Sequence, residues 1–147
     1  MEKLRNYYWS ANQNQLKCTT AGLSEDQYEQ VMKLIRQEIE LEPAFSEHLE
    51  EKISNHLLNF NEYLYKSIMK YHEYELVETS IIPRKEVPEV RVVLRSTRAT
   101  TNLIEGHHAL YRAEQNMCVV LSLNNAEIVT IYNDDVGHKH TDRSFVK

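Results

Sequence analysis

The stretch MCVVLSLNNAEIVTIY, residues 117–132, carries the clearest β-strand pattern of the chain. Two runs rich in β-branched residues, 117–123 and 126–132, flank the pair Asn124-Asn125. Such runs are typical of strands, and an Asn-Asn pair can adopt the positive φ angles of a two-residue turn. The pattern therefore predicts a β-hairpin.

A two-residue turn would also fix the register of this hairpin. The expected pairs are Leu123 with Ala126, Leu121 with Ile128, Val119 with Thr130, and Met117 with Tyr132. The other face would then carry Cys118, Val120, Ser122, Glu127, Val129 and Ile131. Both faces are largely apolar, which indicates a central hairpin with a helix over one side.

Two more strands are expected upstream of the hairpin, over residues 74–82 and 87–95, with 90–95 as the core of the second. Residues 96–102 are rich in Thr and are expected to form a connection. No clear pattern assigns residues 103–113.

Two helices are expected before these strands. Ser24 and Gln27 have the spacing of a capping box, which predicts a helix start. A second, longer helix is expected over residues 46–71, because apolar residues recur there at helical spacing: Leu49, Ile53, Leu57, Phe60, Leu64 and Ile68.

These elements predict an α+β fold, with N-terminal helices packed on a C-terminal antiparallel β-sheet of about four to five strands. A length of 147 residues suits one domain. Within it, residues 1–83 form a mainly helical part that leads into the sheet. Residues 84–147 form the sheet and the candidate active site.

Charge is unevenly spread along the chain. The net charge is −5 overall; it is −6 over residues 1–83 (8 basic, 14 acidic) and +1 over 84–147 (9 basic, 8 acidic). No run approaches the roughly 20 apolar residues of a membrane span, and the N-terminus does not resemble a signal peptide. Cys18 and Cys118 fit no metal-ligand spacing. Two separate thiols are the simpler interpretation, and a disulfide is the alternative.

The last ten residues include five polar side chains that could take part in catalysis: His138, Lys139, His140, Thr141 and Arg143. Imidazole can accept and donate a proton near neutral pH, and Lys and Arg can hold a phosphate. These groups suit metal-independent RNA cleavage, in which the ribose 2′-OH attacks the neighbouring phosphorus and no protein nucleophile is needed. A solvated tail without function is the plain alternative.

Other candidate residues lie upstream. Arg95 and Arg98, with the hydroxyls of Ser96 and Thr97 between them, could cradle a phosphate. His107 and His108 are adjacent, so on a strand they would point to opposite faces. A metal site could instead combine His107 or His108 with Asp134, Asp135, His138 and His140, although zinc sites need a third or fourth committed ligand. No glycine-rich phosphate loop or other cofactor motif occurs, so no cofactor is expected.

Residues 90–147 resemble the ribonuclease toxin superfamily that groups barnase, EndoU, colicin nucleases and RelE (the BECR fold). The likeness is strongest to the toxin tips of contact-dependent growth inhibition and other polymorphic toxin systems. The matching residues are Val119-Val120, then the run from Ile128 to Tyr132, then Asp134, His138 or His140, Thr141 and Asp142. The turn departs from the pattern, since it has Asn124-Asn125 where the family often has Gly.

This resemblance implies a metal-independent endoribonuclease, often acting on tRNA, that leaves a 2′,3′-cyclic phosphate. It also implies a cognate immunity protein and delivery into the cytoplasm of a target bacterium, as the C-terminal part of a larger secreted or surface protein. Carried over by residue, Arg95 would bind phosphate, Thr130 would position the 2′-OH or phosphate, and His140 or His138 would be the general acid or base. Secondary substrate contacts would come from Tyr132, Arg98, His107, His108, Lys139, Thr141 and Arg143.

Two other functions remain open. An interaction module, such as an immunity protein or antitoxin, would suit the acidic charge and would show an acidic or apolar patch instead of a basic cleft. A metal-dependent hydrolase would use His107, His138, His140 and Asp134. The ribonuclease hypothesis predicts instead that His138, His140, Arg95 and Thr130 converge in a positively charged cleft on one sheet face.

Overall fold

A computed structural model describes residues 16–58, 60–82 and 88–137 of the chain. Its elements, in order, are β1 (Leu16–Thr19), a short 3-10 turn (Thr20–Gly22), α2 (Glu25–Glu40), β2 (Ala44–Phe45), α3 (Glu47–Ser54), α4 (Glu62–Tyr71), β3 (Tyr74–Ile82), β4 (Glu89–Glu105), β5 (Leu110–Ser122) and β6 (Glu127–Asp135). Helices precede most of the strands, which confirms the predicted α+β class.

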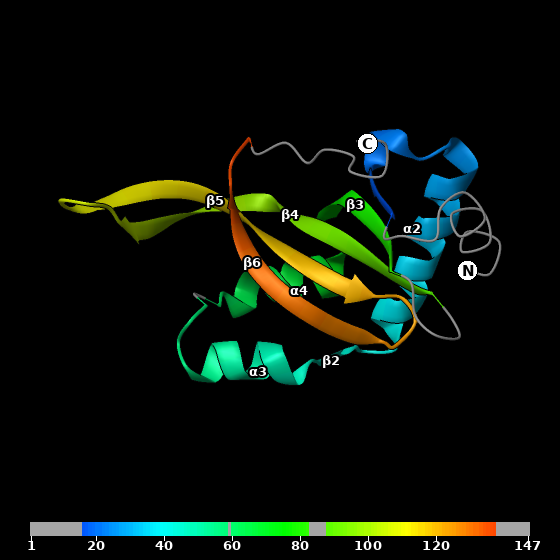
Figure 1. Ribbon diagram of the computed structural model, residues 1–147, viewed down its shortest axis with the longest axis horizontal. Helices are drawn as coiled ribbons and strands as arrows, with labels where there is room; N and C mark the ends of the chain where they lie inside the picture. The colour runs from blue at the N-terminus through cyan, green and yellow to red at the C-terminus, as the bar shows by residue number, and fades with distance from the viewer. Residues whose placement is uncertain (1–15, 59, 83–87, 138–147) are drawn as a thin grey trace.

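The strands form one six-stranded sheet in the order β1-β3-β4-β5-β6-β2 (Figure 1). Strands β3 to β6 make an antiparallel meander, which is the sheet expected from the sequence. Two short edge strands extend it: β1 pairs antiparallel with β3, and β2 pairs parallel with β6. The sheet is therefore mixed at one edge only.

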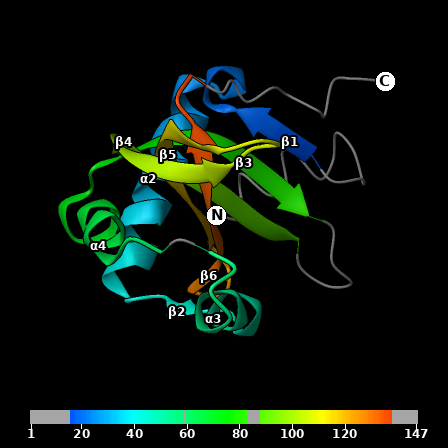
Figure 2. The ribbon, with the colours of Figure 1, turned by 90° about the vertical axis from the view of Figure 1, so that its left-hand side faces the viewer.

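Helices α2 and α4 cover one face of the sheet (Figure 2). Their buried residues include Val31, Ile35, Ile39, Leu64 and Ile68. The strands meet them with alternate residues: Leu76, Ile81, Val90, Val92, Leu94, Met117, Val119, Leu121, Ile128 and Ile131. Burial of this apolar surface is the main favourable contribution to folding, so the helical and β halves depend on each other.

The predicted capping box at the start of α2 is confirmed. The Ser24 hydroxyl accepts a hydrogen bond from the Gln27 N–H at 3.2 Å, and the Gln27 side chain accepts one from the Ser24 N–H at 2.8 Å. These bonds satisfy two N–H groups that the first helical turn leaves unpaired.

The prediction of one long helix over 46–71 was wrong, because the chain turns between α3 and α4. Asn55 ends α3, His56 takes a left-handed φ of 56°, and the Asn61 side chain accepts from the Leu64 N–H at 3.2 Å to start α4. Leu57, placed on the expected apolar stripe, is 73% exposed. α3 consequently lies against β6, while α4 packs against β4 and β5.

The expected connection over 96–102 was also wrong: it is part of β4. After a register shift between Arg95 and Ala99, β4 and β5 stay paired from Ala99–Asn116 to Glu105–Leu110. We call residues 99–116 the arm, because this two-stranded ribbon projects from the rest of the sheet (Figure 1). The Thr residues that suggested a loop are β-branched and fit a strand equally well.

The predicted β5–β6 hairpin is present, but its turn is longer than two residues. Ser122 pairs with Glu127, and the left-handed residue is Ala126, with a φ of 47°, rather than an Asn. Asn124 has another role: its Oδ1 accepts from the Val90 N–H at 2.7 Å and its Nδ2 donates to the Pro88 carbonyl at 3.0 Å. The side chain thus ties the turn to the start of β4.

A bulge changes the register further along this hairpin. Leu121 pairs with Ile128 as predicted, but Thr130 lies opposite Val120 and Tyr132 opposite Cys118. The predicted pairs of Thr130 with Val119 and Tyr132 with Met117 were therefore wrong. One extra residue of β6 at the register shift turns Thr130 and Tyr132 to the sheet face away from α2 and α4.

The two cysteines do not pair. Cys118 is a buried free thiol in β5, and Cys18 belongs to β1, with β3 and β4 between them. Three strand spacings of about 4.8 Å put these strands about 14 Å apart, well beyond the Cα separation of a disulfide. Cys118 therefore does not form the alternative disulfide with Cys18.

Candidate functional site

Arg95, Cys118 and Tyr132 form one row across β4, β5 and β6. Residues directly opposite in antiparallel strands point to the same face, so all three lie on the face away from α2 and α4, which we call the second face. Thr130 lies in the neighbouring row of this face, directly opposite Val120 of β5. With strands about 4.8 Å apart, the backbones of Arg95 and Tyr132 are about 10 Å apart.

Arg95 is oriented by an acidic neighbour. Its Nε and Nη2 both contact Oε1 of Glu75, at 2.7 and 2.5 Å. Glu75 is directly opposite Arg95 in β3. The arginine side chain is 21% exposed and the glutamate 54% exposed, so the pair lies where solvent reaches it.

Burial keeps two groups of the row protonated. It raises the pKa of the Cys118 thiol to about 12, with a further contribution from the Asp134 carboxylate. Burial likewise raises the pKa of Tyr132. At neutral pH Tyr132 is thus a phenol that can donate a hydrogen bond, and Cys118 is no nucleophile, since the thiolate is the reactive form.

Thr130 has a partner that sequence reasoning missed. The Nζ of Lys52, on α3, donates to the Thr130 hydroxyl and to the Ile131 carbonyl, both at 3.4 Å. The ammonium group brings a positive charge to the edge of the second face. No local signal points to Lys52, because it lies 78 residues from Thr130 in the sequence.

The described strands of the second face do not form the expected positive cleft. Outside the arm, β3 to β6 carry on this face two arginines, Arg91 and Arg95, and five carboxylates, for a net charge of −3: Glu75, Glu78, Glu89, Glu127 and Asp134. Apolar side chains also cluster there: Val77, Val93, Cys118, Val120 and Tyr132.

The proposed tail residues His138, Lys139, His140, Thr141 and Arg143 lie outside the described part of the chain. The last strand leads toward them: Asp134 is opposite Asn116, and Asp135 accepts from the Gln115 side chain at 3.0 Å. Among the described residues, no group of three or more His, Cys, Asp or Glu could hold a metal.

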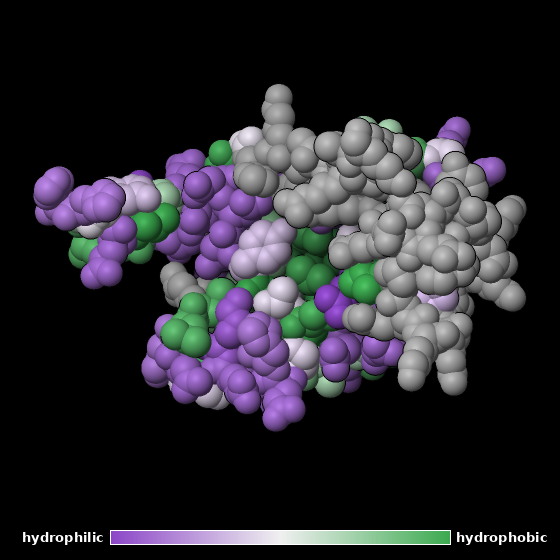
Figure 3. Space-filling view, in the orientation of Figure 1, coloured by the Kyte–Doolittle hydropathy of each residue, from purple (hydrophilic) through white to green (hydrophobic). Residues whose placement is uncertain are grey.

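His107 and His108 do not join the second face. Both are exposed at the tip of the arm, and His108 lies ten residues from Cys118 along the chain. At about 3.3 Å per residue this is about 33 Å. Figure 3 shows hydrophobic atoms along the same arm, and its exposed apolar residues are Leu103, Leu110 and Tyr111.

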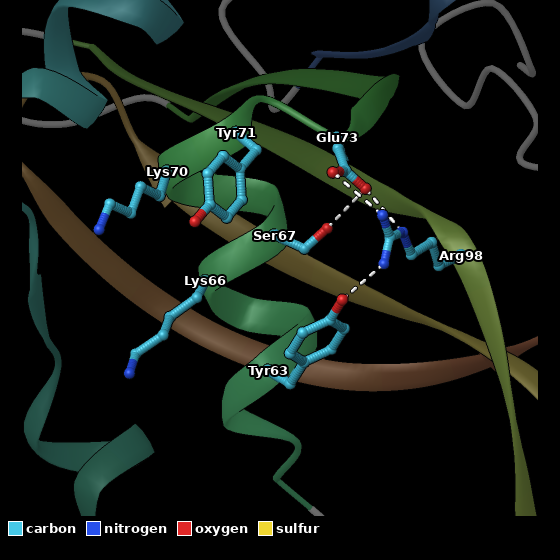
Figure 4. A pocket seen from close by; sticks show the side chains of 7 residues that line it. All are labelled: Tyr63, Lys66, Ser67, Lys70, Tyr71, Glu73 and Arg98. Carbon is cyan, nitrogen blue, oxygen red and sulfur yellow. Dashed lines mark hydrogen bonds and ion pairs between the residues drawn. The ribbon is translucent and has the colours of Figure 1, made fainter.

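Arg95 and Arg98 do not form a single phosphate cradle. Arg98 reaches toward α4, where its Nε lies 2.7 Å from Oε2 of Glu73 and its Nη1 donates to the Tyr63 hydroxyl at 2.7 Å (Figure 4). The register shift just before Ala99 separates the two arginines. Each therefore belongs to a different site.

The Arg98 site is a pocket of about 560 Å³. Its lining residues are Tyr63, Lys66, Ser67, Lys70, Tyr71, Glu73 and Arg98. Five of them share one side of α4 at helical spacing, and this periodicity of Tyr and Lys could have been found in the sequence.

Comparison of the chain with protein-family models, curated proteins and solved structures gave no match. Within the described residues, no helix has the length and apolar character needed to cross a membrane.

Proposed function

We propose that this protein is a metal-independent endoribonuclease toxin acting on RNA, with tRNA as the expected substrate. The observation that supports this most is the placement of Arg95, Thr130 and Tyr132 on one sheet face. These three residues carry roles in the resemblance to BECR-fold toxins, and without the β6 bulge Thr130 and Tyr132 would point into the core.

The chemistry of these residues suits attack by the ribose 2′-OH. Arg95 would bind the scissile phosphate, because a guanidinium matches phosphate oxygens with paired donors. Tyr132, kept as a phenol, would donate to a phosphate oxygen as charge builds on it. Thr130, assisted by Lys52, would position the 2′-OH or the phosphate.

Proton transfer is assigned to His138 or His140, in the segment that follows β6. One imidazole would accept the 2′-OH proton or deliver a proton to the leaving 5′-oxygen. The product would be a 2′,3′-cyclic phosphate. An inert Cys118 is consistent with this scheme, because the substrate supplies its own nucleophile.

The proposal extends to the biological setting. The protein would act in the cytoplasm of a target bacterium, delivered as the C-terminal part of a larger secreted or surface protein, and a cognate immunity protein would bind it in the producing cell. Because the chain has a net charge of −5, we expect its contacts with RNA to be made by a small number of basic residues.

A second candidate function is an interaction module such as an immunity protein or antitoxin. The net charge of −3 on the second face outside the arm favours it, as does the apolar cluster of Val77, Val93, Cys118, Val120 and Tyr132. Such a surface suits a protein partner more than a phosphate backbone.

Matched variants separate the two functions. Arg95→Ala, Thr130→Val, Tyr132→Phe, His138→Ala and His140→Ala would be incubated with total tRNA in excess chelator. The controls are Arg112→Ala and Thr101→Val, exposed residues of the arm. We expect cleavage to fall at least a hundredfold in Arg95→Ala and in one of the His variants, and to stay within twofold in the controls. Equal cleavage by site and control variants would contradict the proposed site.

A further inference from the structure

The pocket beside α4 has a composition that the proposed nuclease chemistry does not use. Leu64 and Ile68 turn the inner side of α4 into the core, and its outer side presents Tyr63, Lys66 and Lys70. Figure 4 shows the two lysines extending to one side of the helix and the Arg98–Glu73 pair lying on the other. Tyr63 and Tyr71, eight residues apart, are separated by about 12 Å along the helix axis.

Arg98 is held in place by Glu73 and Tyr63, and its guanidinium has further N–H donors. Its Nε and Nη2 contact the two Glu73 oxygens at 2.7 and 3.3 Å, its Nη1 contacts the Tyr63 hydroxyl at 2.7 Å, and its guanidinium lies 5.8 Å from the Tyr63 ring centre. A guanidinium has five N–H donors. Three are used here, so two remain to bind an anion in a preorganised geometry.

The carboxylate of Glu73 is already satisfied. It accepts from the Ser67 hydroxyl at 2.9 Å and from Arg98. Lys66 makes an exposed ion pair with Glu62 at 3.4 Å, and such pairs are weak. The lining residues include three cations, Lys66, Lys70 and Arg98, and the single carboxylate of Glu73, so their net charge is +2.

We propose that this pocket binds a phosphorylated nucleoside. The two lysines, which extend to the same side of α4, bring two positive charges, enough to balance a phosphate monoester, which carries about −1.5 to −2 at neutral pH. The rings of Tyr63 and Tyr71 offer stacking surfaces for a base. A pocket of about 560 Å³ lies within the usual range for small-molecule sites. The ligand's source is a free nucleotide or an RNA strand, in which two neighbouring phosphodiesters, with one negative charge each, would together match the lysines.

Equilibrium binding to the full chain tests this pocket. The probes are AMP, adenosine, inorganic phosphate, a 2′-O-methyl RNA hexamer that cannot be cleaved through its 2′ oxygen, and a Glu-rich peptide. The variants are Lys66→Gln/Lys70→Gln and Tyr71→Ser. Their controls are Lys33→Gln, an exposed lysine of α2, and Tyr111→Ser, an exposed tyrosine of the arm. Thermal unfolding confirms that each variant is folded.

We expect AMP to bind at least tenfold more tightly than adenosine. The double lysine variant should weaken AMP binding at least tenfold and Tyr71→Ser at least threefold, with the controls within twofold. Binding of the hexamer in addition to AMP would assign the site to an RNA strand, and binding of AMP alone would assign it to a free nucleotide. The proposal would be overturned if AMP and adenosine bound with equal affinity, or if the lysine variants left AMP binding unchanged. It would also be overturned if only the peptide bound, or if no probe bound.

This inference does not depend on the nuclease proposal. If the protein binds AMP at this pocket but leaves tRNA intact, the nucleotide site is supported and the nuclease function is contradicted. If the protein cuts tRNA but binds none of the probes, the nuclease function is supported and the nucleotide site is contradicted.

Discussion

The hydroxyl of Ser46 donates a hydrogen bond to the carbonyl of Val129 at 2.7 Å and accepts one from the N–H of Leu49 at 3.1 Å. The backbone N–H of Ser46 also donates to the Ile128 carbonyl at 2.9 Å. One residue thus starts α3 and binds β6 where its register shifts. This contact joins residues 83 positions apart at the bulge that places Thr130 and Tyr132 on the second face.

Replacing Ser46 with Ala tests this link. Loss of the helix cap costs about 1 kcal/mol, and loss of the bond to Val129 adds about 1 kcal/mol, so urea unfolding should show about 2 kcal/mol of destabilisation. Ser24→Ala is the matched control, because Ser24 caps α2 without touching β6. It should cost about 1 kcal/mol.

The same pair of variants connects stability to function. At a temperature where both are folded, Ser46→Ala should cleave tRNA at least tenfold more slowly than Ser24→Ala, since Ser46 binds β6 at the bulge and Ser24 caps α2. Equal cleavage rates would show that the bulge is maintained without this contact.

The arm should contribute little to the stability of the fold. Leu110 is 61% exposed on the arm, whereas Leu121, in the same strand, is fully buried in the core. We predict that Leu110→Ser changes the free energy of unfolding by less than about 0.5 kcal/mol, and that Leu121→Ala lowers it by about 2–5 kcal/mol. Chemical denaturation measures both. A large loss in Leu110→Ser would mean that the arm packs against another part of the chain.

Alkaline pH should destabilise the protein through Cys118. Its pKa is raised from 9.0 to about 12 in the folded state, so above pH 9 the unfolded chain loses this proton while the folded chain retains it. The free energy of unfolding therefore falls as pH rises from 9 toward 12, by about 1.4 kcal/mol per pH unit.

Urea unfolding at pH 8 and pH 10, with a reductant, measures this effect. Between these two pH values the wild type should lose about 1 kcal/mol more than Cys118→Ala. The cavity left by Cys118→Ala lowers stability equally at both pH values and cancels in the difference. Identical losses in the two proteins would argue against a protected thiol. Tyr65, whose pKa burial raises to about 12, contributes equally to both.

Local signals in the sequence were sufficient for much of the fold. The Ser24–Gln27 capping box, the strand Tyr74–Ile82 and the pairing of Leu121 with Ile128 are all present. Each rests on contacts between residues close in the chain or on simple alternation. Asn61 was a missed local signal, since an Asn before a helical run is a common N-cap.

The features that were missed depend on distant partners. The bulge in β6 is bound by Ser46, the turn residue Asn124 is bound to Pro88 and Val90, and the edge strand β1 needs β3 beside it. Periodicity cannot reveal such contacts. The resemblance pointed to Arg95, Thr130 and Tyr132 as site residues. The predicted register, however, placed Thr130 and Tyr132 on the face opposite to that of Arg95, because it did not include the bulge.

The central claim is tested most directly by incubating the purified wild-type protein with total tRNA in excess chelator and determining the end groups of any fragments. The nuclease account predicts discrete fragments that end in a 2′,3′-cyclic phosphate. Intact tRNA, both in chelator and with added divalent metal, would contradict it and favour the interaction module.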